Sequence, residues 1–92
     1  MVKHAIFGEL SSPTLDILRM IWVNADEGVG LFTVADVTRP IADRTNERTV
    51  RELFQTMVAH ELMGVEDAEQ AANNRYYLTP RGKKLLDMVL HS

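Results

Sequence analysis

Near its end the chain reads Arg75-Tyr76-Tyr77-Leu78-Thr79-Pro80-Arg81-Gly82-Lys83-Lys84-Leu85-Leu86, and here a short strand runs directly into a helix. Tyr76 and Leu78 recur at every second position, which is the pattern of a strand with one buried face. Thr79 is a favourable N-cap, and Pro80 suits the first helical position because its φ is already helical and no N–H is needed there. The sequence therefore predicts a strand that ends at Leu78 and a helix over residues 80–90.

The residues before this junction predict the partner of that strand. Met63–Glu66 can form a second strand, and the intervening segment Asp67–Asn74 is polar or small, which suits a mobile hairpin tip. We therefore expect a β-hairpin over residues 63–78. Leu31-Phe32, earlier in the chain, can add a further short strand.

A first helix is predicted from Ser12, which can act as N-cap, with Pro13 at the first helical position. Its apolar residues recur at helical spacing and form one stripe toward a core: Leu15, Leu18, Ile21, Trp22 and Ala25. Asp26-Glu27-Gly28 should end this helix. We interpret Trp22 as a core residue in preference to a ligand-stacking one, and the pattern of residues 1–9 leaves strand and helix open.

A second helix is predicted to begin after Thr33. Thr33 and Asp36 have the spacing of a capping box, in which each side chain accepts a hydrogen bond from the backbone N–H of the other residue. Phe32 before the cap and Val37 in the helix can add a hydrophobic staple. Pro40 lacks the N–H that a helical hydrogen bond needs, so this helix should be short or kinked.

A third helix is predicted over residues 46–61, with Thr45 or Asn46 as its N-cap and Glu47 in the first turn. Its apolar stripe consists of Val50, Leu53, Phe54 and Met57. The polar residues that point outward are Arg48, Arg51, Glu52 and Gln55. Arginine can donate two hydrogen bonds to guanine, and glutamine can bind adenine in a similar way, so this face can read DNA. The alternative is a solvated helix face with Arg48–Glu52 and Arg51–Gln55 pairs.

Length and composition limit the class of protein. With 92 residues, of which 46% are hydrophobic and 25% charged, the chain is expected to form a single domain with one modest core over residues 1–92. It has no cysteine, which excludes disulfides and thiolate metal sites, and no apolar run long enough for a membrane helix. Because residues 1–4 lack the features of a signal peptide, we expect a cytoplasmic protein that has no contact with a membrane.

The net charge of −3 is unfavourable for binding nucleic acid, but the charges are unevenly distributed. Basic residues cluster at the end of the hairpin and the start of the last helix: Arg75, Arg81, Lys83 and Lys84. Acidic residues cluster just before them: Glu61, Glu66, Asp67 and Glu69. A local basic surface can therefore bind phosphate although the whole chain is acidic.

The sequence contains no catalytic or metal-binding pattern. His4, His60 and His91 are widely spaced, no glycine-rich phosphate loop follows a strand, and Ser11 and Ser12 are explained as helix-capping residues. We therefore expect a protein that is not an enzyme and that needs neither a metal nor a cofactor.

The succession of three helices, a hairpin and a final helix resembles the winged helix-turn-helix transcription regulators, especially their MarR-like and PadR-like groups. In these families the hairpin, called the wing, commonly ends in an aromatic-Leu-Thr-x-x-Gly-x-x-Leu motif, which Tyr77–Leu85 matches position by position. Thr49–Val65 is similar to their recognition helix and its exit into the wing. The resemblance covers roughly residues 12–90.

Some features of these families are missing. Glu61 occupies the position at the end of the recognition helix where they usually have glycine. The Gly-Tyr and Tyr-Pro pairs of PadR-like proteins are absent, and the chain leaves little room for the long flanking helices with which MarR-like proteins dimerise. The resemblance is therefore to the superfamily and not to one group.

The resemblance implies an α+β, mostly helical fold, a winged helix-turn-helix with a small β-hairpin wing. The residues that it places at base edges in the major groove are Arg48, Arg51 and Gln55. Those that it places near the DNA backbone are Thr45, Asn46 and Thr49, with Arg44 as a further phosphate contact. On the wing, the residues expected at the minor groove or its phosphates are Asn73, Asn74 and Arg75.

The implied function is that of a sequence-specific regulator of transcription that binds double-stranded DNA, and by analogy a repressor. A homodimer through the C-terminal helix and the N-terminal segment is expected because apolar residues cover more than one face of that helix: Leu85, Leu86, Met88, Val89 and Leu90. The alternative for this helix is complete burial in a monomer. The alternative function is a winged-helix module for protein–protein interaction without DNA binding, which the acidic net charge favours.

Overall fold

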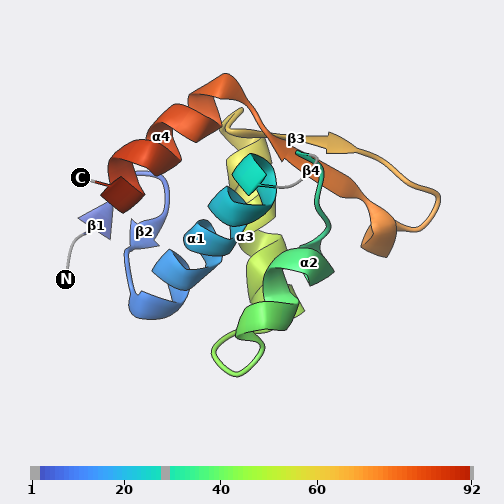
Figure 1. Ribbon diagram of the computed structural model, residues 1–92, viewed down its shortest axis with the longest axis horizontal. Coiled ribbons are helices and arrows are strands. Elements are labelled where there is room, and N and C mark those ends of the chain that lie inside the picture. Colours follow the sequence, from blue (N-terminus) through green and yellow to red (C-terminus); the bar gives the residue numbers. More distant parts are fainter. Residues whose placement is uncertain (1–2, 28–29, 92) are drawn as a thin grey trace.

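The computed structural model describes residues 3–27 and 30–91 and is mostly helical, with a hairpin that extends away from the helices (Figure 1). Its main elements are α1 (Ser12–Glu27), α2 (Val34–Thr38), α3 (Glu47–Ala59), β3 (Met63–Glu66), β4 (Arg75–Leu78) and α4 (Pro80–His91). A short hairpin, β1 (Lys3–His4) with β2 (Gly8–Glu9), precedes them, and the 3-10 turns η1 (Arg39–Ile41) and η2 (Ala71–Asn73) lie between them. The predicted fold class is confirmed.

The apolar faces of these elements meet in one core. Its fully buried side chains include Leu18 and Ile21 of α1, Phe54 and Met57 of α3, and Leu86 of α4. Aromatic rings link the wing to this core, because Phe54 packs edge-on against Phe32 at 5.8 Å and against Tyr76 of β4 at 4.8 Å between ring centroids. The core therefore fixes where the wing stands relative to α3.

The start of α1 corrects one prediction. Ser11, and not Ser12, caps this helix, because the Ser11 hydroxyl accepts from the Thr14 N–H at 3.3 Å and the Ser11 carbonyl accepts from Leu15 at 2.9 Å. Of the two adjacent serines, Ser11 is therefore the one whose hydroxyl reaches the free N–H groups at the start of α1. Trp22 is only partly buried and packs against the edge of the core, with its ring 5.2 Å from that of His91.

The capping box at α2 is confirmed. The Thr33 hydroxyl accepts from the Asp36 N–H at 3.1 Å, and the Asp36 carboxylate accepts from the Thr33 N–H at 2.9 Å. As Pro40 predicts, α2 is short: it ends at Thr38, and the chain continues as the 3-10 turn η1. Only η1 and a short turn therefore separate α2 from α3, as a helix-turn-helix requires.

The wing is the antiparallel hairpin that the sequence predicts over residues 63–78. Met63 is paired with Leu78 and Glu66 with Arg75 in an antiparallel ladder, and Tyr76 and Leu78 face the core side. Phe32 adds a bridge on the other edge, because its N–H and C=O bond to Tyr76 at 3.0 and 2.7 Å. The short strand expected at Leu31-Phe32 is thus a single bridged residue.

The exit from α3 explains the unusual residue at position 61. The N–H groups of Glu61 and Leu62 donate to the carbonyls of Val58 and Met57 at 3.0 and 2.9 Å, which is the Schellman pattern of helix termination. This pattern requires a left-handed residue, and Glu61 adopts φ 59° there. Position 61 is therefore left-handed, although it carries a side chain that disfavours this conformation.

The junction between β4 and α4 packs against this same turn. The Thr79 hydroxyl accepts from the Gly82 N–H at 3.0 Å, as expected of an N-cap, and it donates to the Glu61 carbonyl at 2.8 Å. The Thr79 N–H donates to the Leu62 carbonyl at 3.1 Å. A Cβ on Gly82 would collide with that carbonyl oxygen, so only glycine allows α4 to approach the turn this closely.

The N-terminal segment, which the sequence left open, forms the β1–β2 hairpin. Its turn is held by His4, whose Nδ1 accepts from the N–H groups of Ile6 and Phe7 at 3.0 and 3.4 Å. The His4 and Phe7 rings are stacked at 4.9 Å. This arrangement holds Ile6 at the side of α4.

Candidate nucleic-acid interface

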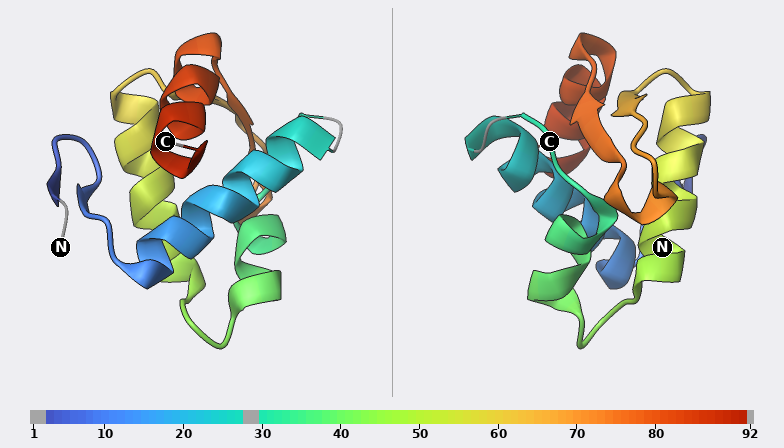
Figure 2. Two further views of the ribbon diagram at one scale, coloured as in Figure 1. Left: turned by 60° about the vertical axis from the view of Figure 1, so that its left-hand side comes forward. Right: turned by 90° about the vertical axis from the view of Figure 1, so that its right-hand side faces the viewer.

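Helix α3 and the wing lie side by side and together form the candidate interface (Figure 2). Asn46 caps the helix, because its side-chain oxygen accepts from the Thr49 N–H at 2.9 Å. Val50, Phe54 and Met57 are buried, and they hold one face of α3 against the core. The opposite face of α3 is consequently turned to solvent.

The outward residues of α3 differ in their exposure. The Arg48 side chain is 87% exposed, whereas that of Arg51 is 44% exposed because it lies at the side of the helix. Gln55 is exposed as well, one turn further along. All three residues that the resemblance places at base edges therefore lie on the surface, and Arg48 is more exposed than Arg51.

Each arginine of α3 has an acidic partner one turn away. The Arg48 Nε lies 3.5 Å from Glu52 Oε1, as the alternative interpretation of this face predicts. Arg51 does not pair with Gln55, because its Nη2 lies 3.9 Å from Glu47 Oε2 and a carboxylate attracts a guanidinium more strongly than an amide does. The predicted DNA contacts include neither Glu47 nor Glu52, although the helical spacing of these acids from the arginines is visible in the sequence.

The predicted backbone-contacting residues at the start of α3 and just before it differ in how far they are engaged within the protein. Arg44 reaches Asp16 of α1 at 3.3 Å and Asp43 at 3.6 Å. Thr45 is half-buried, and its N–H donates to the Ile41 carbonyl at 3.2 Å. Thr49 is exposed, but its N–H is used by the Asn46 cap. Next to the start of α3, Arg44, Asn46 and Thr49 are therefore exposed, whereas Thr45 is half-buried.

The tip of the wing is held by Asn74. Its side-chain oxygen accepts from the Ala68 N–H at 2.8 Å, and its amide donates to the Asp67 carboxylate at 3.5 Å. Asn74 thus shapes the tip that the sequence predicts to be mobile, whereas the side chains of Asn73 and Arg75 are exposed. The three wing residues predicted to meet DNA therefore differ in role within the protein itself.

A groove of about 290 Å³ separates α3 from the wing. Its walls are formed by Gln55, Val58, Ala59, Val65, Asp67, Asn74 and Tyr76. Asn73 and Arg75 line a second hollow, of about 520 Å³, with Leu31 and Thr33 on the α2 side of the wing. The structure therefore brings Gln55 and Asn74 together, and it places Arg75 on a neighbouring surface and Arg44 beside α1.

In the described part of the chain, no group of three or more His, Asp or Glu side chains could hold a metal ion. None of the helices in residues 3–27 and 30–91 is long and apolar enough to cross a membrane.

The fold is shared with solved structures of other proteins. The structure is similar to BpsR of Bordetella bronchiseptica, whose DNA binding is regulated by 6-hydroxynicotinic acid, with a TM-score of 0.66 and 22% identity over 89% of this chain and 58% of that chain. It is also similar to MarR of Staphylococcus aureus in complex with salicylate and kanamycin, with a TM-score of 0.61 and 22% identity over 82% of this chain and 46% of that chain. The chain thus spans about half the length of the structures it matches.

No protein-family profile matches the sequence, and no curated protein is similar to it in sequence. The resemblance is therefore one of three-dimensional structure, and it agrees with the order of elements and with the Tyr77–Leu85 motif. The chain has the MarR-like winged helix-turn-helix fold.

Proposed function

We propose that the protein is a transcription regulator that binds double-stranded DNA in a sequence-specific manner, as a homodimer, and represses transcription by occupying a promoter. The observation that carries this proposal is the placement of α3. Its polar face is exposed, its apolar face is fixed by the core, and the wing flanks it across a groove lined by Gln55 and Asn74. A helix presented in this way can enter the major groove, which is wide enough to admit it.

In this proposal α3 reads bases and the surrounding residues bind the backbone. Arg48 donates to guanine and Gln55 binds adenine, since both side chains have the donor and acceptor groups that these bases require. Arg51, at the side of the helix, is within reach of either a base edge or a phosphate. The residues assigned to phosphate and to the minor groove are Arg44, Thr45, Asn46, Thr49, Asn73, Asn74 and Arg75.

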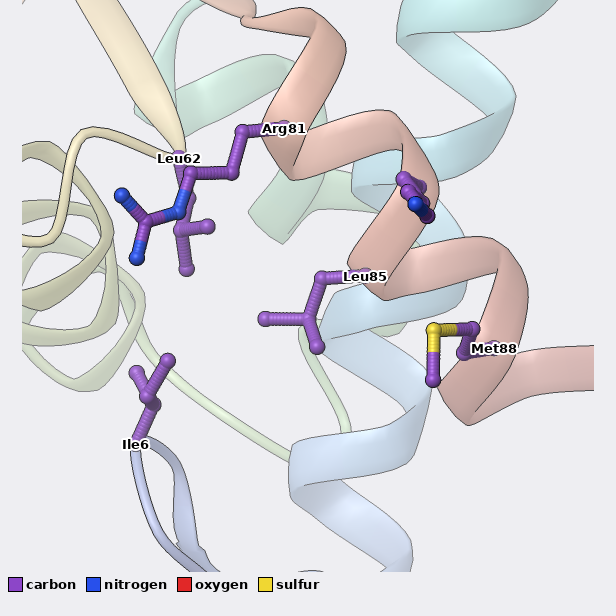
Figure 3. Close-up of a pocket in the computed structure, with 6 residues that line it drawn as sticks. Ile6, Leu62, Arg81, Leu85 and Met88 are labelled. Carbon is purple, nitrogen blue, oxygen red and sulfur yellow. The ribbon is translucent and has the colours of Figure 1, made fainter.

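An apolar surface beside α4 supports the homodimer. Met88 is 59% exposed, and with Ile6, Leu62 and Leu85 it surrounds a pocket of about 210 Å³ (Figure 3). Arg81 and Lys84 form its polar rim. A small protein gains stability by covering such a surface, and a symmetric dimer would present two copies of α3 about 34 Å apart, one turn of DNA.

A titration with DNA tests the proposal. Random-sequence and candidate promoter duplexes are titrated with wild-type protein, Arg48→Ala and Lys83→Ala at several salt concentrations. We expect wild-type affinity to fall steeply with salt, by about 0.9 log units per log unit of salt for each phosphate neutralised. Arg48→Ala should lose sequence preference, whereas Lys83→Ala on α4, which removes the same charge, should keep it.

The absence of binding to any duplex at low salt would refute DNA recognition. Retention of the wild-type sequence preference by Arg48→Ala would refute its role in base reading while leaving DNA binding intact.

A protein-interaction module is the second candidate, and the charges of the interface favour it. Glu47 and Glu52 balance the two arginines of α3, and Glu66, Asp67 and Glu69 are exposed on the wing. A basic protein partner would be attracted to such a surface. The same salt titration separates the two functions, because this module has no affinity for DNA at low salt.

A further inference from the structure

Glu52 stands at the centre of the outward face of α3. Successive residues of an α-helix are about 100° apart, so Arg48 and Glu52 lie about 40° from each other and on either side of the direction opposite the buried residues Val50, Phe54 and Met57. Arg51 lies about 90° from that direction. The exposures agree with this geometry, since the side chains of Arg48, Glu52 and Arg51 are 87%, 66% and 44% exposed.

A carboxylate in this place is unfavourable for non-specific DNA binding, because it would approach a surface covered by phosphates. One base edge nevertheless attracts it with no acceptor beside the donor. In the major groove cytosine presents the N4 amino group, from which glutamate can accept a hydrogen bond. The N6 amino group of adenine lies beside the acceptor N7, and the O6 of guanine and the O4 of thymine are themselves acceptors, so these edges repel a carboxylate. Glu52, like Arg48, can therefore discriminate between bases.

The ion pair leaves both side chains able to do this. It joins Arg48 Nε to Glu52 Oε1 at 3.5 Å, which is too long for a strong hydrogen bond. The guanidinium carries further N–H donors on its two terminal nitrogens, and the carboxylate has a second oxygen. The terminal nitrogens suit the O6 and N7 of guanine, and Oε2 suits the N4 of cytosine.

We infer that Glu52 is a specificity-determining residue, and that Arg48 and Glu52 together read a guanine and a neighbouring cytosine in the major groove. This inference rests on the proposed function. It assigns to Glu52 a direct contact with a base, in addition to its contact with Arg48. It also accounts for the presence of an acid beside Arg48 on α3. Glu52 lowers the affinity for DNA of any sequence, but it adds discrimination between bases.

The experiment is a selection of binding sites from a random duplex library by wild-type protein, Glu52→Gln, Glu52→Ala and Glu47→Gln. The selected duplexes and their single-base variants are then measured by fluorescence anisotropy. Glu47→Gln is the matched control, because it removes the same charge from the side of the helix and frees Arg51 in place of Arg48. Circular dichroism verifies that each variant is folded.

We expect wild-type sites to contain the guanine and the cytosine, with roughly tenfold weaker binding when the cytosine is replaced. Glu52→Gln should change the preferred base at that position to adenine, since glutamine binds the N6 and N7 of adenine. Glu52→Ala should tolerate any base there, and Glu47→Gln should keep the wild-type preference. In all three variants the preference for guanine should persist.

Three outcomes would overturn the inference, and they are distinguishable. An unchanged cytosine preference in Glu52→Gln and Glu52→Ala would show that the carboxylate does not contact a base. Loss of the guanine preference alone would show that Glu52 only positions Arg48. Failure of the wild-type protein to bind any duplex at low salt would overturn the proposed function together with this inference.

Discussion

Substitution of Gly82 by alanine offers a sharp test of the packing between α4 and the turn after α3. In most helices this change is stabilising by about 1 kcal/mol, because alanine has the higher helix propensity. Here the new Cβ would collide with the carbonyl oxygen of Leu62, and it would lie 2.9 Å from the carbonyl carbon of Leu62 and 3.2 Å from a methyl carbon of Leu78. Backbone atoms cannot turn aside as a side chain can, so α4 must move.

The expected cost follows from what that movement disturbs. Overpacking of a close-packed site costs about 1–3 kcal/mol, and its upper end applies when the obstructing atom belongs to the backbone. The displacement also weakens the hydrogen bonds from Thr79 to the carbonyls of Leu62 and Glu61, at 3.1 and 2.8 Å, which contribute about 1 kcal/mol each. After the gain in helix propensity, we expect a net loss of about 3 kcal/mol.

Urea denaturation followed by circular dichroism and by the fluorescence of Trp22, the one tryptophan of the sequence, measures this loss. A destabilisation of this size should lower the melting temperature by on the order of 15 °C in a domain of this length. The control is Lys83→Ala, an exposed position on the same helix, which should change stability by less than about 0.5 kcal/mol. A Gly82→Ala protein as stable as the wild type would refute the close approach of α4 to Leu62.

Three other predictions concern stability and assembly. Glu61→Gly should stabilise the protein by up to about 1 kcal/mol, because glycine adopts the left-handed conformation at φ 59° without strain; a loss of stability in urea denaturation would contradict this. Thr33→Ala should cost about 1 kcal/mol in the same assay by removing the α2 cap, and an unchanged midpoint would show that the capping box contributes nothing. Met88→Glu should shift the sedimentation of the proposed dimer to that of a monomer, while a wild-type protein that is monomeric at every concentration would refute the dimer.

The prediction of the elements succeeded where the signal is local. The Thr33 and Asp36 capping box and the Thr79-Pro80 helix start each depend on residues within one turn of each other, and so does the cap of α3, which the sequence places at Thr45 or Asn46 and the structure at Asn46. Such contacts form in the same way whatever surrounds them, so spacing alone identifies them. The prediction of Ser12 as the N-cap of α1 was wrong. Adjacent serines have the same N-cap propensity, and the path of the backbone into the helix decides that Ser11 is the cap.

The candidate site was less accessible to sequence reasoning. Spacing shows that Arg48, Arg51 and Gln55 avoid the apolar stripe of α3, but it does not rank their exposure, which depends on what packs beside the helix. The contact between Arg44 and Asp16 joins residues far apart in the chain, so no local pattern announces it. The bonds of Asn74 join residues six and seven positions apart across the wing tip, a spacing that matches no helix or cap pattern, so the sequence does not show its role there.

By itself the sequence determined the order of the elements from α1 to α4, the caps of α2 and α4 and the buried faces of the helices, because these follow from short-range hydrogen bonding and from the periodicity of apolar residues. Tertiary structure decided why Gly82 belongs to the motif at the wing–helix junction, since only the packed turn at Glu61 and Leu62 puts a carbonyl where a Cβ would be. It also decided how strongly the side chains of Arg48, Glu52 and Arg51 are exposed on the outward face of α3. Both depend on the distance between elements, which the burial of the common core sets.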